Sequence, residues 1–465
     1  MNTITHSTLM TLGIIWAAGW TALTVMAWSL RTRQLRKQAG WGVILMIIAI
    51  AFGLRLMAIT ADGPTLSDDL WRYVHDGYTL ASGDSPYQLA PDEHEKTTMP
   101  WAKYINHRHL VTIYQPTSQW FFAGLWLAGD KLQQVAGTST TWTHAMVFRL
   151  GFVLFDLLII SLLIVVLKGH GRSVWWTTLY AWHPMPILEI GSSGHQDVIG
   201  MMWLLLCMVL LNKDTHTSCE QNACHSKWIW SSMIRVGISG AAFALACGVK
   251  PIVAPLMLPL AWQLRRRPLS MICAATTATI SLAILYLPFG LMEGGLGRLL
   301  ETVQIFTHHW RFNGSLHSVA EMLSGSKTVA DITAGLLLVG LLALWLRYGL
   351  DTWRIAGFYF LWTILLSSTA HPWYLLWALV FIPIIFQPAT WILSLTIGWS
   401  YVALLDRETY LVPTWIRLAQ YLPVYIAICW SLMTRSSQSR LQVESTGRTS
   451  GPDKNRPLSR MNKLN

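Results

Sequence analysis

Two adjacent carboxylates, Asp68 and Asp69, follow the second long apolar stretch of the chain. An acidic cluster at a membrane boundary costs hydration free energy, so its presence indicates a specific role. Carboxylates in such a place can act as a general base that takes a proton from an attacking hydroxyl group. At helical spacing, Arg72 and Asp76 share one face with Asp68, and Gly83 with the following Asp-Ser-Pro ends the helix. The sequence therefore predicts a charged, water-facing helix at the bilayer surface.

The same pair of acids also has a structural interpretation. Ser-Asp-Asp before an amphipathic run is a common start of a helix, and one acid could serve only as its N-cap. Capping does not need the further charges at Arg72 and Asp76. We therefore favour a functional role for Asp68 and Asp69.

Other polar residues that are unusual beside apolar stretches lie in four later segments. One segment is broken by Pro and Gly, one precedes Pro251, one is a loop, and one begins a later span. Their candidate residues are Glu189, His195 and Asp197; Lys250; His308, His309, Trp310, Arg311 and Asn313; and His371, Trp373 and Tyr374. Carboxylates, imidazoles, cations and aromatic rings that converge on one face are typical of a catalytic cavity.

Several of these residues have structural alternatives. Glu189 and Asp197 could form a buried ion pair with Lys250 that serves folding. For Trp310 and Trp373 we favour places at the membrane interface, because Trp is enriched at both membrane surfaces. For His371 both interpretations stay open.

The composition indicates a polytopic membrane protein. The chain has 465 residues, of which 53% are hydrophobic and 12% charged, and its mean hydropathy is +0.41. The net charge of +11 comes from short basic clusters next to apolar stretches, which argues for orientation signals and against nucleic-acid binding. The six cysteines form no disulfide framework. A metal site from His216, Cys219, Cys224 and His225 fits no common zinc spacing, so we favour an ordinary polar loop.

We expect an all-α transmembrane bundle with about 11–13 spans, since a straight crossing takes about 20 apolar residues. The apolar stretches are 8–30, 41–60, 143–167, 173–190, 195–211, 228–250, 252–264, 269–290, 328–347, 355–370, 373–388, 390–406 and 415–434. The basic clusters predict the cytoplasmic side, which places 61–110, 189–197, 291–320, 371–373 and 407–414 outside. For 111–135 we favour an interfacial or re-entrant helix over a span.

The chain divides into four expected parts. They are N-terminal transmembrane helices in 1–60, with 8–30 as a retained anchor; an outer catalytic loop with interfacial helices in 61–142; a transmembrane bundle in 143–434; and a basic, cytoplasmic tail without fixed structure in 435–465.

The run from Ser67 to Gly77 resembles a motif of the GT-C superfamily of membrane glycosyltransferases. The likeness is nearest to bacterial polyprenol-phosphomannose-dependent mannosyltransferases, and more distant to the first mannosyltransferase of GPI-anchor assembly. Further similar pieces are Gly83 to Tyr87, Tyr114-Gln115-Pro116, Pro184 to Asp197, and His371 to Tyr374, so the likeness covers most of the chain. Relatives usually have Tyr-Pro-Pro where this chain has Tyr-Gln-Pro.

The resemblance implies a GT-C-like fold and an essential acid in the first outer loop, either Asp69 or Asp68. It implies transfer of a sugar, with mannose expected, from a polyprenyl phosphate to a glycolipid or envelope glycan. Expected donor and phosphate ligands are Arg72, Lys250, Arg311 and His371, because a positive charge stabilises the leaving phosphate. Other expected substrate contacts are Asp76, Tyr87, Glu189, His195, Asp197, Trp310, Asn313, Trp373 and Tyr374, with the two Trp rings able to stack on a sugar or an isoprenoid. The sequence neither requires nor excludes a divalent metal.

The main alternative is a secondary transporter or lipid flippase, in which intramembrane acids and broken helices bind substrate near the bilayer centre. The gathering of polar groups at one face, and the lack of an evident repeat, disfavour it. A structural partner in an envelope assembly is a third interpretation. We expect a bacterial inner membrane, membrane lipids as neighbours, no nucleic-acid partner, and an active site that faces outward.

Overall fold

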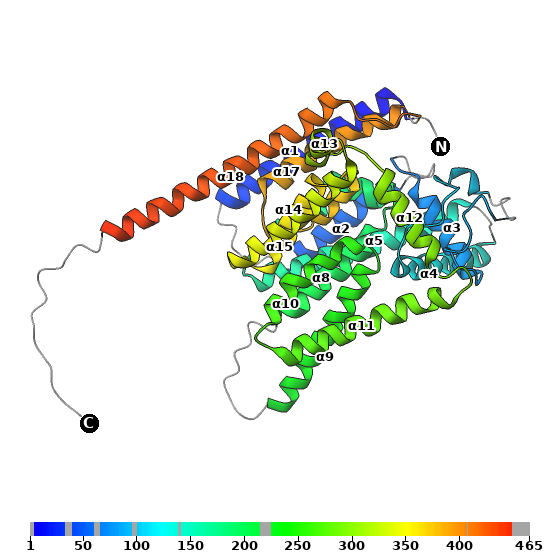
Figure 1. Cartoon of the computed structure of the whole chain (residues 1–465), viewed down its shortest axis with the longest axis horizontal. Coiled ribbons are helices and arrows are strands. Elements are labelled where there is room, and N and C mark those ends of the chain that lie inside the picture. Colours follow the sequence, from blue (N-terminus) through cyan, green and yellow to red (C-terminus); the bar gives the residue numbers. More distant parts are fainter. Residues whose placement is uncertain are drawn as a thin grey trace, which may run out of the picture.

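In the computed structural model, residues 4–32, 40–59, 66–94, 100–137, 141–213, 225–406 and 408–448 are described. All regular elements in this part of the chain are helices, as the sequence predicted (Figure 1). Eight of them are long and apolar enough to cross a membrane, fewer than the roughly 11–13 spans that we expected. They are α1 (His6–Thr32), α2 (Trp41–Ala58), α5 (Thr141–Gly169), α9 (His225–Cys247), α11 (Pro268–Leu291), α14 (Lys327–Arg347), α17 (Pro388–Thr396) with η6 (Ile397–Leu405), and α18 (Thr414–Arg448).

The remaining elements are shorter. They are α3 (Asp69–Ala81), η1 (Ala102–Tyr104), α4 (Pro116–Ala136), η2 (Val174–Thr177), α6 (Thr178–Ala181), α7 (Pro184–Pro186), η3 (Ile187–Ser192), α8 (Asp197–Lys213), η4 (Pro251–Leu256), α10 (Met257–Leu264), α12 (Gly297–His309), α13 (Leu316–Ser324), α15 (Thr352–Leu365), η5 (Pro372–Leu375) and α16 (Leu376–Leu379). The stretches 173–190 and 373–388, which we expected as single spans, are broken into several of these pieces. Irregular backbone at membrane depth is tolerated where protein buries it, and most residues of both stretches are buried.

Local sequence sets many of the helix boundaries. Pro residues occupy the first turn of α4, α11 and α17, where the missing N–H costs no intrahelical hydrogen bond. The side chains of Ser326 and Asp351 cap α14 and α15 by accepting from the backbone N–H groups of Val329 and Arg354. Gly137 ends α4 in the left-handed conformation.

Helices α3 and α4 pack against each other at one end of the bundle, where α12 also lies (Figure 1). Helix α4 covers most of the uncertain stretch 111–135, and it is not among the eight candidate spans. Helices α1, α17 and α18 run side by side along one edge. Helix α18 continues to Arg448, into the segment expected as a tail without fixed structure, and 449–465 lie outside the described residues. His216, Cys219 and Cys224 of the weighed metal site also lie outside them.

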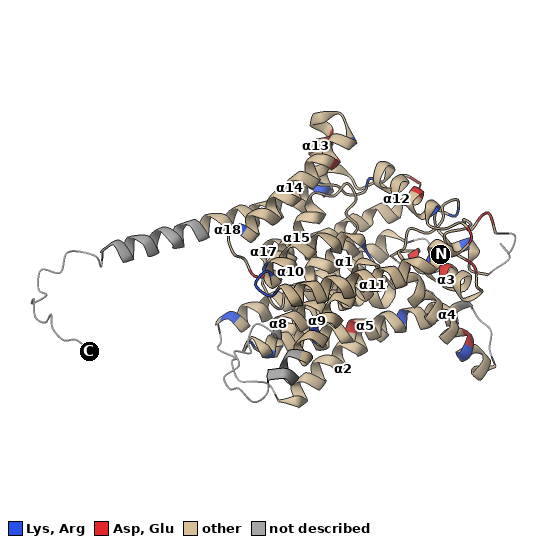
Figure 2. Cartoon of the chain, turned by 60° about the horizontal axis from the view of Figure 1, so that its bottom comes forward, with Lys and Arg blue, Asp and Glu red and all other residues tan. Residues whose placement is uncertain are grey.

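Charges divide between the two ends of the bundle. Figure 2 shows Asp and Glu mainly at the end that carries α3 and α4, and Lys and Arg at both ends. At the opposite end, basic residues from two predicted cytoplasmic clusters, 31–37 and 168–172, meet aromatic rings. Arg31 lies over Phe386, Lys168 over Trp41, and Arg172 over Trp176. These two of the basic clusters that the sequence assigned to one side therefore lie at the same end of the bundle.

A fully buried ion pair joins two of the candidate spans. Arg55 of α2 donates to Asp156 of α5, and both side chains are 0% exposed. The Tyr180 hydroxyl donates to the other carboxylate oxygen at 2.6 Å, and Arg55 also donates to the Ala181 carbonyl at 2.7 Å. Because charged groups in an apolar interior need partners, this cluster ties the broken segment to α2 and α5.

We expect Asp156→Ala to lower the free energy of unfolding by about 3–5 kcal/mol, because it leaves the Arg55 guanidinium buried and unpaired. An Arg55→Met/Asp156→Leu protein should recover most of that loss. Thermal unfolding in detergent measures both effects. The control is Arg354→Met, which breaks an exposed pair with Asp351 and should change stability by about 0–1 kcal/mol. Equal losses in the buried and exposed variants would contradict this account.

Candidate functional site

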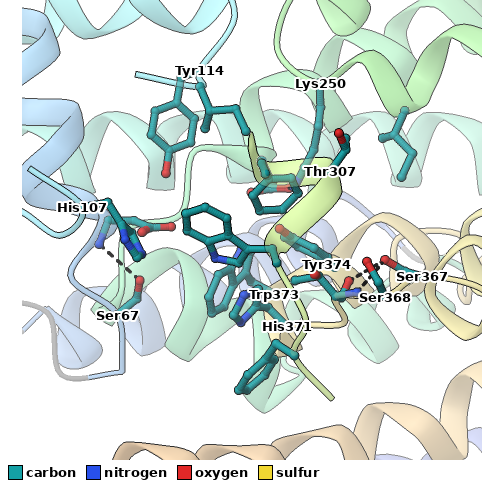
Figure 3. A pocket seen from close by; sticks show the side chains of 18 of the residues that line it. Ser67, His107, Tyr114, Lys250, Thr307, Ser367, Ser368, His371, Trp373 and Tyr374 are labelled. Carbon is teal, nitrogen blue, oxygen red and sulfur yellow. Dashed lines mark hydrogen bonds and ion pairs between the residues drawn. The ribbon is translucent and has the colours of Figure 1, made fainter. Parts of the chain in front are cut away.

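A cavity of about 1080 Å³ opens between the segment around α3 and the later parts of the chain (Figure 3). All five segments that the sequence singled out contribute to its lining. The predicted residues on its wall are Asp68, Asp69, Arg72, Asp197, Lys250, Trp310, Arg311, His371, Trp373 and Tyr374. The predicted residues outside the wall are Asp76, Tyr87, Glu189, His195, His308, His309 and Asn313. Figure 3 shows His107 and Tyr114 on one side of the cavity and Lys250 and Thr307 on the other.

Asp68 and Asp69 share one hydrogen-bond donor. The side-chain amide of Asn106 donates to one oxygen of each carboxylate, both at 2.9 Å. Asp68 occupies the N-cap position of α3 without a capping side-chain bond, and Ser67 Oγ accepts from the Asp69 backbone N–H at 3.3 Å. Helix capping therefore does not account for either carboxylate. Asn106 escaped the sequence analysis because its loop has no periodic pattern that would place it beside α3.

The Asp69 carboxyl group has an altered acidity. Burial, and then the charge of Asp68, raise the pKa of Asp69 from 3.8 to about 6, while hydrogen bonds from Asn106 and Tyr114 lower it. Its side chain keeps 20% exposure, so the group remains reachable from the cavity. A reachable carboxylate with a pKa near neutrality is suited to take up a proton and release it again.

We expected Arg72 and Asp76 on a water-facing surface of the helix, and this prediction is wrong. The two side chains form an ion pair of 3.1 Å and are only 6% and 2% exposed. Arg72 also donates to the Leu110 carbonyl at 2.7 Å, and Gln119 of α4 donates to Asp76 at 3.1 Å. The reason is that α4 and the segment before it cover this face of α3. Asp76 thus fastens α3 to α4, and Arg72 reaches the cavity wall with its charge already paired.

Lys250 brings a cation to the cavity. Its Nζ lies 2.6 Å from Asp197 and 4.0 Å from the centre of the Tyr374 ring, and the side chain is 25% exposed. The Trp377 indole N–H also donates to Asp197 at 2.6 Å. The sequence correctly offered Asp197 as a partner of Lys250. Glu189 is not part of that pair, because its carboxyl group lies beside His195 instead, at 3.4 Å from Nε2.

Five rings from four segments form a continuous stack beside the cavity. The centre-to-centre distances are 4.1 Å for His195 on Trp373, 4.3 Å for Trp373 on His371, 4.3 Å for His371 on Phe312, and 5.0 Å for Phe312 on Tyr410. Imidazole rings cover both faces of Trp373, which is 7% exposed. Neither a place at the membrane interface nor stacking on a sugar describes this residue. Phe312 and Tyr410 escaped the sequence analysis, since only the fold brings them together.

The other predicted residues divide between the rim and the supporting structure. Trp310 is half-buried on the cavity wall, with its ring edge-on to His107 at 4.7 Å. Arg311 lies at the rim, 51% exposed and 2.7 Å from Glu321. Asn313 has a left-handed backbone and donates to the Ala370 carbonyl at 3.2 Å, and the Tyr87 hydroxyl donates to the Tyr114 carbonyl at 2.8 Å. Asn313 and Tyr87 therefore support the site from outside the cavity.

Among the described residues, no group of three or more His, Cys, Asp or Glu side chains is placed to hold a metal ion. Neither a scan of protein-family models nor a search of curated proteins finds a match for this chain. Its chemistry is therefore inferred from the side chains and their geometry.

The close approach of α3 to α4 depends on Gly77. A Cβ atom at this position would lie 2.5 Å from the backbone oxygen of Phe122. We expect Gly77→Ala to push α3 away and lower stability by about 1–3 kcal/mol. The matched control is Gly124→Ala in α4, where a Cβ meets nothing within 4 Å and Ala gains about 0.5–1 kcal/mol of helix propensity. Thermal unfolding should separate the two variants, and a Gly77→Ala protein as stable as Gly124→Ala would refute the tight contact.

Proposed function

We propose that the chain is an integral membrane glycosyltransferase. It transfers a sugar, with mannose expected, from a polyprenyl phosphate to a glycolipid or envelope glycan on the outer side of a bacterial inner membrane. The observation that carries this proposal is the presence of Asp69, with its raised pKa, and the Lys250 cation in the wall of one cavity. The resemblance of the segment Ser67 to Gly77 to GT-C enzymes supports the same reaction.

The chemistry assigns different tasks to these two residues. Asp69 takes the proton of the acceptor hydroxyl while its oxygen attacks the anomeric carbon of the donor. The bond from that carbon to the phosphate oxygen breaks, and its electron pair leaves with the phosphate. Lys250 stabilises this developing negative charge from a fixed position, and Arg311 adds a cation at the rim.

A second cavity, of about 540 Å³, favours a lipid-linked substrate over a water-soluble one. Apolar side chains of α1, η6 and α18 make up most of its wall, and Leu66 belongs to the walls of both cavities. All three elements belong to candidate membrane spans. In this proposal the isoprenoid chain lies in the apolar cavity and its phosphate end lies in the first cavity, whose wall carries Asp69 and Lys250.

Asp69→Asn should abolish sugar transfer while the protein stays folded, because the amide keeps the shape of the side chain but cannot take a proton. Asp68→Asn should be the next most severe change. The assay is transfer from a radiolabelled polyprenyl-phosphate sugar by purified protein in liposomes. Asp84→Asn, an exposed acid just beyond the same helix, is the control and should keep the parental rate.

The pH profile gives the assay a second readout. Asp69 is ionised and active above its pKa of about 6, so transfer should fall as the pH drops through that value. Parental transfer by Asp69→Asn with matched expression would sink the assignment of the base. Movement of labelled lipid across the membrane without a new glycosidic bond would instead identify a flippase.

The outward orientation predicts which exposed positions react with an impermeant thiol reagent in intact cells. In a background without the six native cysteines, Ser82→Cys and Ser324→Cys should be labelled. Both positions are exposed and lie near the end of the helical bundle that carries the cavity. Arg266→Cys, in a basic cluster of the opposite side, should react only after the membrane is permeabilised. Labelling of Arg266→Cys in intact cells would overturn the orientation.

A further inference from the structure

Glu189 is a fully buried acid that the proposed reaction does not use. Its side chain is 0% exposed, and within the described part of the chain neither carboxyl oxygen makes a hydrogen bond of ordinary geometry. Its Oε2 lies 3.4 Å from Nε2 of His195. An acid kept in such a place requires an explanation, because burial of an unsatisfied carboxyl group costs free energy.

His195 connects this acid to the proposed base. The ring is also 0% exposed, with Nε2 lying 3.4 Å from Oε2 of Glu189 and Nδ1 lying 3.9 Å from Oδ2 of Asp69. Its stack on Trp373, at 4.1 Å and 15°, fixes the plane in which both nitrogens point. Gly194, with a φ of 71°, makes the turn that brings His195 between the two acids.

Burial decides where the protons reside. An ionised Glu189 with a protonated His195 would place two charges in a fully buried region, where Asp197 and Asp69 already bring negative charge near Glu189, which disfavours that state. A neutral Glu189 can donate a hydrogen bond from its carboxyl O–H group to Nε2 of His195. A neutral imidazole carries one N–H group, so its proton is then on Nδ1 and faces Asp69. The opposite tautomer would turn a lone pair toward the ionised carboxylate.

We propose that Glu189 and His195 are positioning residues for Asp69. Glu189, as a neutral acid, donates to Nε2 and holds the imidazole in the tautomer that donates from Nδ1 to Oδ2 of Asp69. Asn106 donates to the other oxygen of Asp69 at 2.9 Å, so the two donors fix the orientation of the carboxylate. The contact of 3.9 Å tightens when substrate fills the cavity. This inference rests on the proposed function, in which Asp69 is the base.

Other charged groups face this chain of residues and are the same in every variant of the test. Asp68, at the N-cap of α3, and Asp197 of α8 act on Asp69 by their charge, and the Tyr114 hydroxyl acts on it by a hydrogen bond. Asp197 and Lys250 also act on His195. A change confined to Glu189 or His195 therefore leaves the rest of the electrostatic surroundings in place.

The test compares Glu189→Gln with Glu189→Leu in the liposome assay. The Gln amide still donates to Nε2, so Glu189→Gln should stay within about threefold of the parental kcat, whereas Glu189→Leu should lose about tenfold or more, as expected for one hydrogen bond to the base. KM should change little in both variants, because neither residue lines the cavity. A Glu189→Gln protein as inactive as Glu189→Leu would show that an ionised carboxylate is needed and would overturn the proposal.

His195→Phe keeps the ring stack but removes the donor to Asp69. Without that donor the ionised base is less stable, so the acidic fall of the pH profile should move upward by about one pH unit. The control is His183→Phe, which replaces another fully buried imidazole of the same broken segment that bonds to Ser394. It can lower stability, but it should leave the pH profile unchanged. An unchanged profile for His195→Phe would mean a purely structural role and would overturn the proposal.

Infrared spectroscopy tests the neutral acid without any turnover. At neutral pH the parental protein should show a C=O stretching band of a protonated carboxyl group that is missing in Glu189→Gln. If the parent transfers sugar but lacks this band, the positioning inference fails and the proposed function stands. If the band is present but the parent transfers no sugar, the proposed function fails instead.

Discussion

The carboxylate of Asp197 holds together the parts of the chain that surround the cavity. It accepts from Lys250, at the N-cap of η4, and from the indole of Trp377 in α16, both at 2.6 Å. A buried carboxylate needs such partners, and the partners here come from segments that are far apart in sequence. Gly200, one turn further along α8, lets Trp377 and Val249 approach the helix backbone closely. The position of the Lys250 cation therefore follows from the first turn of α8.

A similar logic fixes the acidic side of the cavity. The Arg72–Asp76 pair and Gln119 fasten α3 to α4, and Asn106 ties the two carboxylates at the start of α3 to the following loop. Each charge that folding buries here has a partner, so the charges stay in defined places. At Asp69, burial and the charge of the neighbouring Asp68 raise the pKa of the carboxyl group, while its side chain remains 20% exposed. Arg72 and Asp76 thus hold α3 in place, whereas Asp69, the first residue of the helix, is the reactive group.

The ring stack gives the floor of the cavity a different character from its walls. Its rings pack face to face over distances of 4.1 to 5.0 Å. An apolar, rigid floor of this kind keeps water away from His195 and Glu189 and strengthens electrostatic interactions at Asp69. The proposed transfer benefits twice, since a desolvated base and a fixed cation act on the same substrate.

The sequence alone determined the helical class, eight of the thirteen expected apolar spans and the five segments that meet at the cavity, because hydropathy and breaks by Pro and Gly are local signals. It also found the pairing of Asp197 with Lys250. Only the tertiary structure decided that Arg72 and Asp76 are covered by α4, that Glu189 faces His195, and that imidazoles enclose Trp373. These outcomes depend on which faces of distant segments come into contact, and spacing along one chain segment carries no information about the element that will cover it.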